Sequence, residues 1–193
     1  MSEADRAKWD ARYVASAGHD RAQASRFLHD HLHLIDPGPA LDVACGRGRN
    51  ALLLAARGFS VDALDISAVA LAHAQRSAED TAVHVNWVCQ DLSEDMNVPR
   101  AGYQLILMFH FVAFELLHTL AGALAPGGWL MVEEHLRWPT PVSGPGSERF
   151  RVAPGQLAAA VPELQTCVYH EGLVSTGDGT EAALAQLLAR RPL

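Results

Sequence analysis

The stretch that decides the fold is Leu41-Asp42-Val43-Ala44-Cys45-Gly46-Arg47-Gly48-Arg49-Asn50. A short apolar run leads into two glycines, and an apolar pattern with helical spacing follows. This order is typical of a strand, a tight turn and a helix N-terminus at which the backbone approaches a ligand closely. We therefore predict a ligand-binding turn between a strand over residues 40–44 and a helix over residues 50–57.

Strand and helix patterns alternate from residue 40 to about residue 136. The further strands are predicted at 60–64, 83–88, 103–109 and 129–133, and the further helices at 68–77, where Ser67 is the cap, and at 114–124. Strands separated by helices of this length indicate a parallel, doubly wound sheet. Residues 93–102 are predicted to be a loop, and Pro126-Gly127-Gly128 a turn.

The N-terminal part of the chain differs from this core. Residues 1–36 read as helical, with a break at Gly18-His19-Asp20 and a second helix from about Gln23 to Leu34. Two interpretations are compatible with the pattern: helices that pack on the sheet, and a lid over the glycine turn.

The C-terminal part is predicted to be a mobile loop over 137–147, a short helix over 154–161 and a hairpin. Gly177-Asp178-Gly179 separates the apolar runs 165–174 and 180–189, and an Asp-Gly turn between such runs favours two paired strands. The second run also suits a helix by composition, but we predict a strand. The expected fold is thus a single α/β domain over residues 1–193, with a doubly wound, mostly parallel seven-stranded Rossmann-like sheet, helices on both faces and a C-terminal antiparallel hairpin.

Composition restricts the function classes. The net charge of −7 over 193 residues argues against nucleic acid as a partner. No apolar run approaches the roughly 18 residues needed to span a bilayer, and the charged N-terminus lacks a signal-peptide core, so we expect no membrane and a cytoplasmic location. The three cysteines are far apart, and the histidines of 29–33 do not share one helix face, so no metal site is predicted. A monomer or homodimer is expected.

The glycine turn does not fit a dinucleotide or a P-loop. A dinucleotide fingerprint needs glycine at the positions of Ala44, Gly46 and Arg49, and only Gly46 fits. No Gly-Lys-Ser or Gly-Lys-Thr follows, which excludes the P-loop pattern.

The pattern Asp-x-Ala-Cys-Gly-x-Gly instead resembles motif I of the class I S-adenosylmethionine-dependent methyltransferases. The resemblance continues in order over residues 40–135. Asp65 ends the second strand nineteen residues after Gly46, Asp91 follows the third strand, and the run 124–132 is similar to the family's turn before the fifth strand. This resemblance implies S-adenosylmethionine as cofactor.

The resemblance also implies roles for individual residues. Gly46 and Gly48 clear room for the ligand, Asp42 and the carbonyl of Ala44 meet its ammonium, and Asp65 holds the ribose hydroxyls. The remaining cofactor residues that it implies are Trp9 and Tyr13 as a lid, Cys45, Asn50, Ile66, Ser67, Gln90, Asp91, Leu92, Phe109 and His110.

The sequence defines the methyl acceptor less clearly than the cofactor. The Asn-Pro-Pro-Tyr and Asp-Pro-Pro-Tyr motifs of amino-group methyltransferases are absent, which together with the acidic charge favours a small molecule. A base is needed only if the acceptor must lose a proton. The candidates are His110, Glu134 and His135.

A narrower resemblance is to the tellurite-resistance methyltransferases and their thiopurine methyltransferase relatives. It rests on residues 9–13, on residues 151–157 and on Tyr169-His170-Glu171. The group has Glu where this chain has Gln156, and Asn where it has His170, so specificity stays open. The resemblance implies thiols or chalcogen oxyanions such as tellurite, and Arg149 or Arg151 is either a cation for an oxyanion or a surface residue.

Three functions remain open at this point. The first is a small-molecule methyltransferase. The second is an NAD-dependent oxidoreductase on the same fold, which Ala44 and Arg49 disfavour. The third is a catalytically silent protein that binds S-adenosylmethionine.

Overall fold

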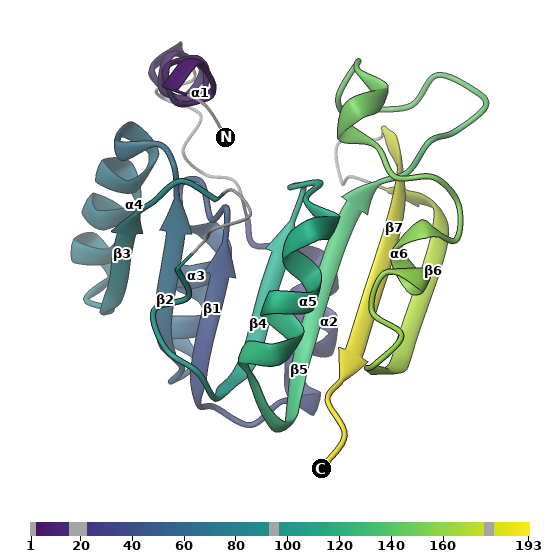
Figure 1. Cartoon of the computed structure of the whole chain (residues 1–193). Coiled ribbons are helices and arrows are strands. Elements are labelled where there is room, and N and C mark those ends of the chain that lie inside the picture. Colours follow the sequence, from purple (N-terminus) through teal and green to yellow (C-terminus); the bar gives the residue numbers. More distant parts are fainter. Residues whose placement is uncertain (1–2, 16–22, 93–96, 176–179) are drawn as a thin grey trace.

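A seven-stranded sheet in the order β3-β2-β1-β4-β5-β7-β6 organises the chain (Figure 1). The computed structural model describes residues 3–15, 23–92, 97–175 and 180–193. Strands β1 to β5 run parallel to one another, while β7 is antiparallel to both β5 and β6. The predicted doubly wound sheet with a C-terminal antiparallel hairpin is therefore confirmed, and the hairpin turn at 177–179 lies outside the described residues.

The strands are β1 Pro39–Val43, β2 Ser60–Asp65, β3 Val85–Cys89, β4 Tyr103–Phe109, β5 Leu124–His135, β6 Gln165–Ser175 and β7 Glu181–Arg190. The α-helices are α1 Glu3–Ala15, α2 Arg26–His31, α3 Arg49–Ala56, α4 Ala68–Thr81, α5 Phe114–Ala123 and α6 Gln156–Ala159. Short 3₁₀-helices span Leu32–Leu34 and Glu148–Phe150.

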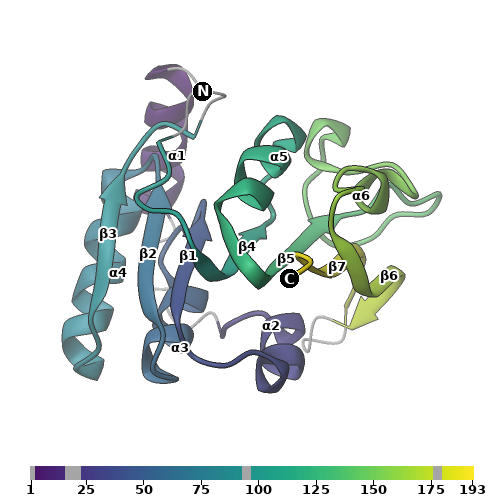
Figure 2. The ribbon, with the colours of Figure 1, turned by 60° about the horizontal axis from the view of Figure 1, so that its bottom comes forward.

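Two hydrophobic cores lie on the two faces of the sheet. The helices α2 and α3 bury Phe27, Leu28 and Leu54 against one face, and α4 adds Leu71. The other face is covered by α5 and α6, which bury leucines such as Leu117 and Leu157. Figure 2 shows α2 and α5 on opposite sides of the sheet. Strands β1 and β4 are buried on both faces, as their nearly continuous apolar sequences predict.

The predicted turn at Pro126-Gly127-Gly128 is wrong, because these residues already belong to β5, which begins at Leu124. The pairing of β4 with β5 shifts between Tyr103 and Leu105. A Cβ on Gly128 would lie 2.6 Å from the carbonyl oxygen of Tyr103, so only glycine permits this close approach. The Pro-Gly-Gly sequence that predicted a turn therefore forms a bulge inside the strand.

Two predicted helix lengths also change. The helix expected over 23–34 is confined to α2, which Ser25 caps by accepting a hydrogen bond from the amide of Phe27, and a 3₁₀ turn follows it. In contrast, α4 extends beyond Ser77 to Thr81, whose hydroxyl donates to the carbonyl of Ser77 at 2.8 Å. Ser67 caps α4, as predicted, by accepting from the amide of Ala70.

Helix α1 stands apart from both cores. It buries no residue, and it packs on α4 above the carboxyl ends of β2 and β3 (Figure 1). Asp10 of α1 accepts a hydrogen bond from the Ser67 hydroxyl, and the amide of Val69 lies 3.5 Å from the same oxygen. Polar contacts at the N-terminus of α4 therefore hold α1 in place.

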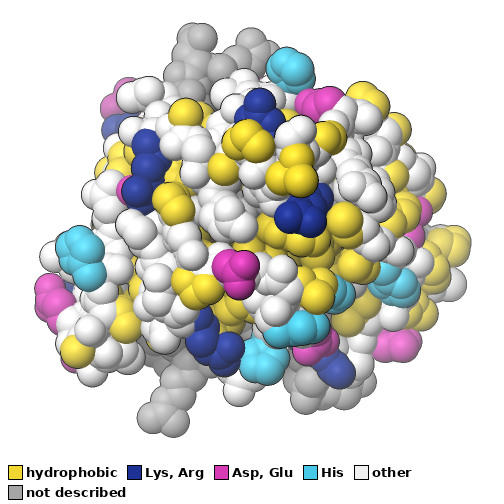
Figure 3. Space-filling model, turned by 90° about the horizontal axis from the view of Figure 1, so that it is seen from below, with side chains coloured by type: hydrophobic (Ala, Val, Ile, Leu, Met, Phe, Trp, Pro, Cys, Tyr) yellow, Lys and Arg dark blue, Asp and Glu magenta, His cyan; other side chains and the backbone are white. Residues whose placement is uncertain are grey.

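The end of the molecule opposite the carboxyl ends of β1 to β5 carries dispersed charges. In Figure 3, Lys, Arg, Asp, Glu and His side chains are scattered among hydrophobic ones and do not gather by sign. Within the described ranges, no helix is long and apolar enough to cross a membrane.

Candidate active site

A cavity of about 770 Å³ opens at the carboxyl ends of β1, β2, β4 and β5, which is where open α/β sheets bind ligands. Helix α1 and the segment 144–150 border it from two sides, and Nζ of Lys8 on α1 lies 5.4 Å from the ring centre of Phe150 on that segment. The lining residues are Trp9, Arg12, Tyr13, Asp42, Ala44, Cys45, Gly46, Arg47, Arg49, Asn50, Leu52, Asp65, Ile66, His73, Ser77, Leu92, Phe109, His110, Phe111, His135, Gly144, Pro145 and Phe150.

The glycine turn has a left-handed backbone at every second residue. The φ angles are 56° at Ala44, 55° at Gly46 and 73° at Gly48. Alanine rarely adopts this conformation, so the surrounding contacts must hold Ala44 in it. One of these contacts is the hydrogen bond from the amide of Cys45 to the carbonyl of Leu64, 2.9 Å long.

Asp65 ties the end of β2 to the glycine turn. Its Oδ2 accepts the amide of Gly46 and its Oδ1 accepts the amide of Ser67, both at 2.8 Å. Burial raises the pKa of Asp65, against the opposing effect of these two hydrogen bonds. Each carboxylate oxygen has a second lone pair, so Asp65 can still accept two hydroxyl groups of a ligand.

Asp42 lies under the same turn and is only 2% exposed. Its Oδ2 accepts the amide of Ala51 in the first turn of α3 at 3.1 Å. Burial raises the pKa of Asp42 to about 7. A cationic group of a ligand would favour the charged form of this carboxyl group, so Asp42 can pair with such a group.

Tyr13 of α1 reaches into the glycine turn. A Cβ on Gly46 would lie 2.6 Å from the Tyr13 hydroxyl oxygen, so the absence of a side chain at Gly46 makes room for Tyr13 in this structure. Arg47 helps to fix the C-terminal part of α1, because its guanidinium donates to the Tyr13 carbonyl at 2.8 Å. The predicted lid residues Trp9 and Tyr13 therefore both border the cavity.

His110 and His135 form a stacked pair at the ends of β4 and β5. Their ring centres are 4.6 Å apart and their planes are inclined by 24°. His110 has a left-handed backbone, with φ of 57°, and its amide donates to the carbonyl of Glu133 at 2.7 Å. Burial, together with the neighbouring charges of His110 and Arg151, lowers the pKa of His135 to about 4.

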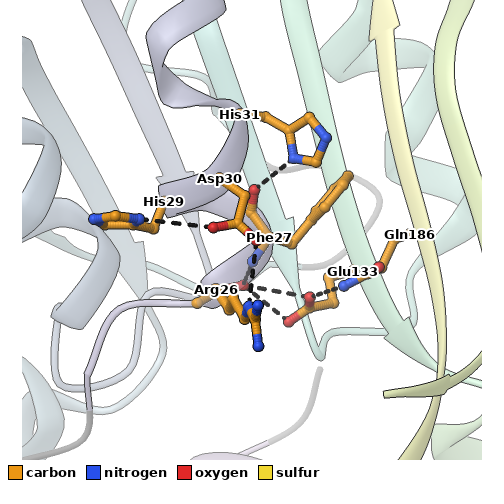
Figure 4. Close-up of polar contacts among 8 residues, drawn as sticks. Arg26, Phe27, His29, Asp30, His31, Glu133 and Gln186 are labelled. Atoms are coloured by element: carbon orange, nitrogen blue, oxygen red, sulfur yellow. Dashed lines mark hydrogen bonds and ion pairs between the residues drawn. The ribbon is translucent and has the colours of Figure 1, made fainter. Parts of the chain in front are cut away.

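Glu133 joins this pair to the rest of the fold. Its Oε1 lies 3.3 Å from Nε2 of His110, and its Oε2 accepts the amide group of Gln186 at 2.7 Å. The Ser25 hydroxyl lies 3.2 and 3.3 Å from the two carboxylate oxygens. Figure 4 shows Glu133 between Gln186 and the start of α2. Burial opposes ionisation of Glu133, but hydrogen bonds from His110, Gln186 and Ser25 outweigh it and hold its pKa below the ordinary value.

Glu134 points to the opposite face of β5, as strand geometry requires. Its Oε1 accepts the amide of Phe111 at 2.8 Å, and it does not line the cavity. Burial raises the pKa of Glu134 well above its ordinary value. Two consecutive glutamates of β5 therefore hold the turn at residues 110–111, one from each face.

Besides Glu134, six predicted site residues do not line the cavity. Gly48 faces β3 instead, because a Cβ there would lie 2.5 Å from the Trp87 ring and 3.0 Å from the side chain of Ala74. Ser67 is occupied as the cap of α4. The others are Gln90, Asp91, Arg149 and Arg151, although Leu92, directly after Asp91, does reach the cavity.

The two predicted substrate arginines are engaged elsewhere in the structure. The Arg151 guanidinium faces the backbone carbonyls of Leu136, Ser143 and Pro145 at 2.9, 3.5 and 3.1 Å, which ties the 143–151 segment to the end of β5. Arg149 lies over the Phe150 ring at 4.4 Å from its centre. Both arginines therefore shape the segment beside the cavity.

The sequence reasoning missed several residues that build this site. Arg12, Arg47, Phe111 and Phe150 line the cavity, and Glu133 holds His110. Strand alternation could have placed Glu133 and Glu134 on opposite faces, but it does not say which face meets His110. Within the described ranges, no group of His, Cys, Asp and Glu is arranged to hold a metal ion.

The cavity fits S-adenosylmethionine. Its volume lies in the range of about 300–1,000 Å³ that small-molecule sites have. The buried carboxyl groups of Asp42 and Asp65 lie close to the ends of two strands, where the resemblance predicts partners for the ammonium and the ribose hydroxyls of the ligand.

Comparison with known proteins agrees with this geometry. Residues 40–128 match the family described as a methyltransferase domain. TehB from Haemophilus influenzae superposes with a TM-score of 0.77 at 18% identity, over 95% of this chain and 67% of that one. No curated protein sequence matches the chain.

Two further solved structures share the fold. One, described as "Conversion of a Disulfide Bond into a Thioacetal Group during Echinomycin Biosynthesis", has a TM-score of 0.75 at 17% identity over 97% of this chain and 91% of that one. The magnesium protoporphyrin IX methyltransferase of Synechocystis PCC 6803, solved with bound S-adenosylhomocysteine, has a TM-score of 0.65 at 16% identity over 97% and 98%.

The match of residues 40–128 to a methyltransferase domain favours a methyltransferase over the alternative of an NAD-dependent oxidoreductase. The glycine turn, Asp42 and Asp65 all lie within this domain, and the sheet around it has the fold of known methyltransferases. Residues 40–128 match a methyltransferase domain, and this domain together with the shared fold indicates S-adenosylmethionine as the cofactor.

Proposed function

We propose that the chain methylates a small molecule, either a thiol or a chalcogen oxyanion such as tellurite. The observation that carries this proposal is the size of the cavity. Helix α1 and the segment 144–150 border about 770 Å³ at the strand ends, a volume that accommodates a cofactor together with a small acceptor.

The narrower resemblance supports the acceptor class. Residues 9–13 and 151–157 resemble the tellurite-resistance and thiopurine methyltransferases, and the first of these ranges contains the lid residues Trp9 and Tyr13. The echinomycin structure offers a sulfur-containing precedent on the same fold, since its description concerns a disulfide and a thioacetal.

S-adenosylmethionine supplies a methyl group on a sulfonium, which is already activated for transfer. The contribution of the chain is to orient the acceptor, to exclude water and to remove a proton where the acceptor has one. Asp42, the turn at Gly46 and Asp65 would hold the cofactor, and Phe109 and His110 would border the place of the methyl group.

Binding of S-adenosylhomocysteine tests the cofactor part of the proposal by calorimetry. Asp65→Ala removes the acceptors at the end of β2, so we expect at least tenfold weaker binding, which corresponds to about 1.4 kcal/mol or more. Asp36→Ala serves as the control, because Asp36 is exposed and does not line the cavity. Equal affinity of the Asp65 variant and the wild type would refute the ribose assignment.

Turnover of S-adenosylmethionine with a panel of thiols, selenite and tellurite tests the acceptor. We expect one class on the panel to raise the formation of S-adenosylhomocysteine well above the background rate. Tight binding without turnover of any acceptor would instead favour a catalytically silent binding protein.

A further inference from the structure

Three basic side chains gather where the cavity meets solvent, between α1 and the segment 144–150. Nζ of Lys8 lies 5.4 Å from the ring centre of Phe150, and the guanidinium carbon of Arg149 lies 4.4 Å from the same centre. Lys8 and Arg149 are exposed, whereas Phe150 is half-buried and lines the cavity. The third is Arg12, which lines the cavity and follows Lys8 by about one helical turn, so both lie on the same side of α1. We call Lys8, Arg12 and Arg149 the basic rim.

Lys8 and Arg149 are close enough to bind one small anion together. Their distances to the Phe150 ring centre total 9.8 Å, which is therefore the largest possible separation of the ammonium nitrogen and the guanidinium carbon. Both side chains are long and exposed, so small rotations can bring them onto a shared anion. A carboxylate or a phosphate has several oxygens that can accept hydrogen bonds from both cations at once. The basic rim thus has the composition and the spacing of a site for an acid group.

The carboxylates beside the basic rim are engaged elsewhere. Asp10 of α1 is hydrogen-bonded to the N-terminal cap of α4, and Oε2 of Glu148 lies 3.4 Å from Nε of Arg137. Neither Lys8 nor Arg149 forms an ion pair with any residue that the structure describes. The chain has a net charge of −7, so an anion can bind only where there is a local excess of positive charge. The basic rim supplies this excess at the entrance of the cavity.

The cavity wall that adjoins the basic rim is apolar. Phe150 contacts both Lys8 and the cavity, and Phe111 and Pro145 line the same cavity. A ligand whose acid group binds at the rim can therefore lay an apolar spacer along these side chains. Its other end then enters the part of the cavity that contains Phe109, beside the predicted place of the methyl group.

We propose that the acceptor is a small thiol that carries an acid group, a carboxylate or a phosphate, and that Lys8 and Arg149 bind this group at the basic rim. The inference rests on the proposed function and selects one acceptor class within it, a thiol in which an apolar spacer separates the sulfur from the acid. Lys8 and Arg149 determine specificity through binding of the acceptor, and they do not contact the reacting atoms. Arg12 adds positive charge on the same side of α1.

Two matched thiols measure the preference of the basic rim without turnover. The protein is saturated with S-adenosylhomocysteine, and calorimetry compares 6-mercaptohexanoate with 6-mercaptohexanol, which differ mainly in charge. We expect the carboxylate to bind about fivefold more tightly or better, since two exposed ion pairs contribute a few-fold each. The preference should shrink as the salt concentration rises from about 20 mM to about 500 mM, because salt screens exposed charges. Hexanoate and hexyl phosphate, each compared with hexanol, extend the test to the two acids, and tighter binding of either acid supports the proposal.

Lys8→Met and Arg149→Met each remove one charge and keep a long apolar side chain. We expect the preference for the carboxylate to fall about two- to threefold in each variant and to disappear in the double variant. Arg6→Met is the matched control, because Arg6 is also exposed on α1 but lies two residues from Lys8 and therefore on another face of the helix. The control removes the same net charge, so an unchanged preference would show that the position of the charge matters.

Steady-state kinetics distinguish recognition of the acid from a structural role of Lys8. Lys8→Met should raise KM for 6-mercaptohexanoate about two- to threefold more than KM for 6-mercaptohexanol, because only the first thiol has an acid to bind. An equal change for both thiols would mean that the variant has displaced α1, and it would overturn the role of Lys8 in specificity.

The results separate the inference from the proposed function. If the wild-type protein binds no S-adenosylhomocysteine, the proposed function fails. If it binds S-adenosylhomocysteine but prefers neither acid to the matched alcohol, or if the double variant keeps the preference, the inference is overturned and the proposed function stands. Turnover of tellurite without turnover of either thiol would also overturn the inference and leave the proposed function in place.

Discussion

Asp42 is a buried carboxyl group beside the glycine turn, and its ionised form is disfavoured in the folded protein. The residue is 2% exposed, and its partner in the structure is a neutral backbone amide. An acid whose pKa rises on folding binds a proton more tightly in the native state than in the unfolded state. The free energy of unfolding therefore decreases as the pH rises between the ordinary value of 3.8 and about 7.

Asp42→Asn should remove this loss, because the amide oxygen can still accept the amide of Ala51. We expect the free energy of unfolding of the variant to increase relative to that of the wild type between pH 4.5 and pH 8. The increase is at most about 4 kcal/mol, at about 1.4 kcal/mol per pH unit. Urea unfolding at the two pH values measures the difference. Asp36→Asn changes an exposed carboxylate, so its free energy of unfolding should not change relative to the wild type between the two pH values. If the difference between Asp42→Asn and the wild type were the same at both pH values, the raised pKa of Asp42 would be contradicted.

His110 and Glu133 differ in how far the sequence could identify them. His110 was predictable as a site residue, because it directly follows an apolar strand whose carboxyl end faces the ligand. Glu133 was not, because its role depends on the register that pairs Phe109 with Glu133 across β4 and β5. Side-chain pairings across strands depend on the register, and the sequence of one strand does not contain it.

At the scale of elements, the glycine turn is constrained from two directions. Gly46 leaves room for Tyr13 of α1, and Gly48 leaves room for Trp87 of β3. Both have a positive φ, so a side chain at either position meets an unfavourable backbone as well as a neighbour. The turn therefore also fixes how closely α3 approaches β3 and α4.

The contribution of this close packing can be isolated with two substitutions. Gly102→Ala introduces a side chain at a φ of 82° with no atom within 4 Å, so we expect only the backbone cost of about 1–2 kcal/mol. Gly48→Ala has a similar φ of 73° but a Cβ 2.5 Å from Trp87, and overpacking should add about 1–3 kcal/mol. Urea unfolding of the two variants gives the difference, and equal losses would show that Trp87 yields without cost.

Elements with a strong periodic pattern were predictable, and those shaped by their neighbours were not. The strands β1, β2 and β4 follow from buried apolar runs, and the hairpin strands β6 and β7 from an Asp-Gly turn between two apolar runs. The start of β5 could not be predicted, since Pro126-Gly127-Gly128 has the composition of a turn and only the approach of Tyr103 makes it a bulge. The domain division into 1–36, 40–136 and 137–193 stays a prediction.

At the scale of the whole molecule, stability and ligand access reside in different parts. The two cores lie on the sheet and on helices α2 to α6, whereas α1 buries no residue. It is held by the contacts of Asp10 with Ser67 and of the Tyr13 carbonyl with Arg47. Local opening of such an element does not require the cores to unfold.

Asp10→Ala should therefore change ligand exchange and leave stability almost unchanged. We expect a change in the free energy of unfolding within about 0.5 kcal/mol, together with several-fold faster dissociation of S-adenosylhomocysteine. Stopped-flow fluorescence follows the dissociation, since Trp9 lines the cavity. Glu3→Ala, another acidic residue of α1, is the control. A lower urea midpoint with unchanged dissociation would show that α1 is part of the cooperative core.

The position of Tyr13 over Gly46 has a consequence for the rate of turnover. The Tyr13 hydroxyl lies where a side chain on Gly46 would be, beside the predicted place of the cofactor, so we expect α1 to lift when the spent cofactor leaves. Each catalytic cycle then contains one opening and one closing of this helix. The frequency of that movement sets a ceiling on kcat, whichever acceptor the site takes.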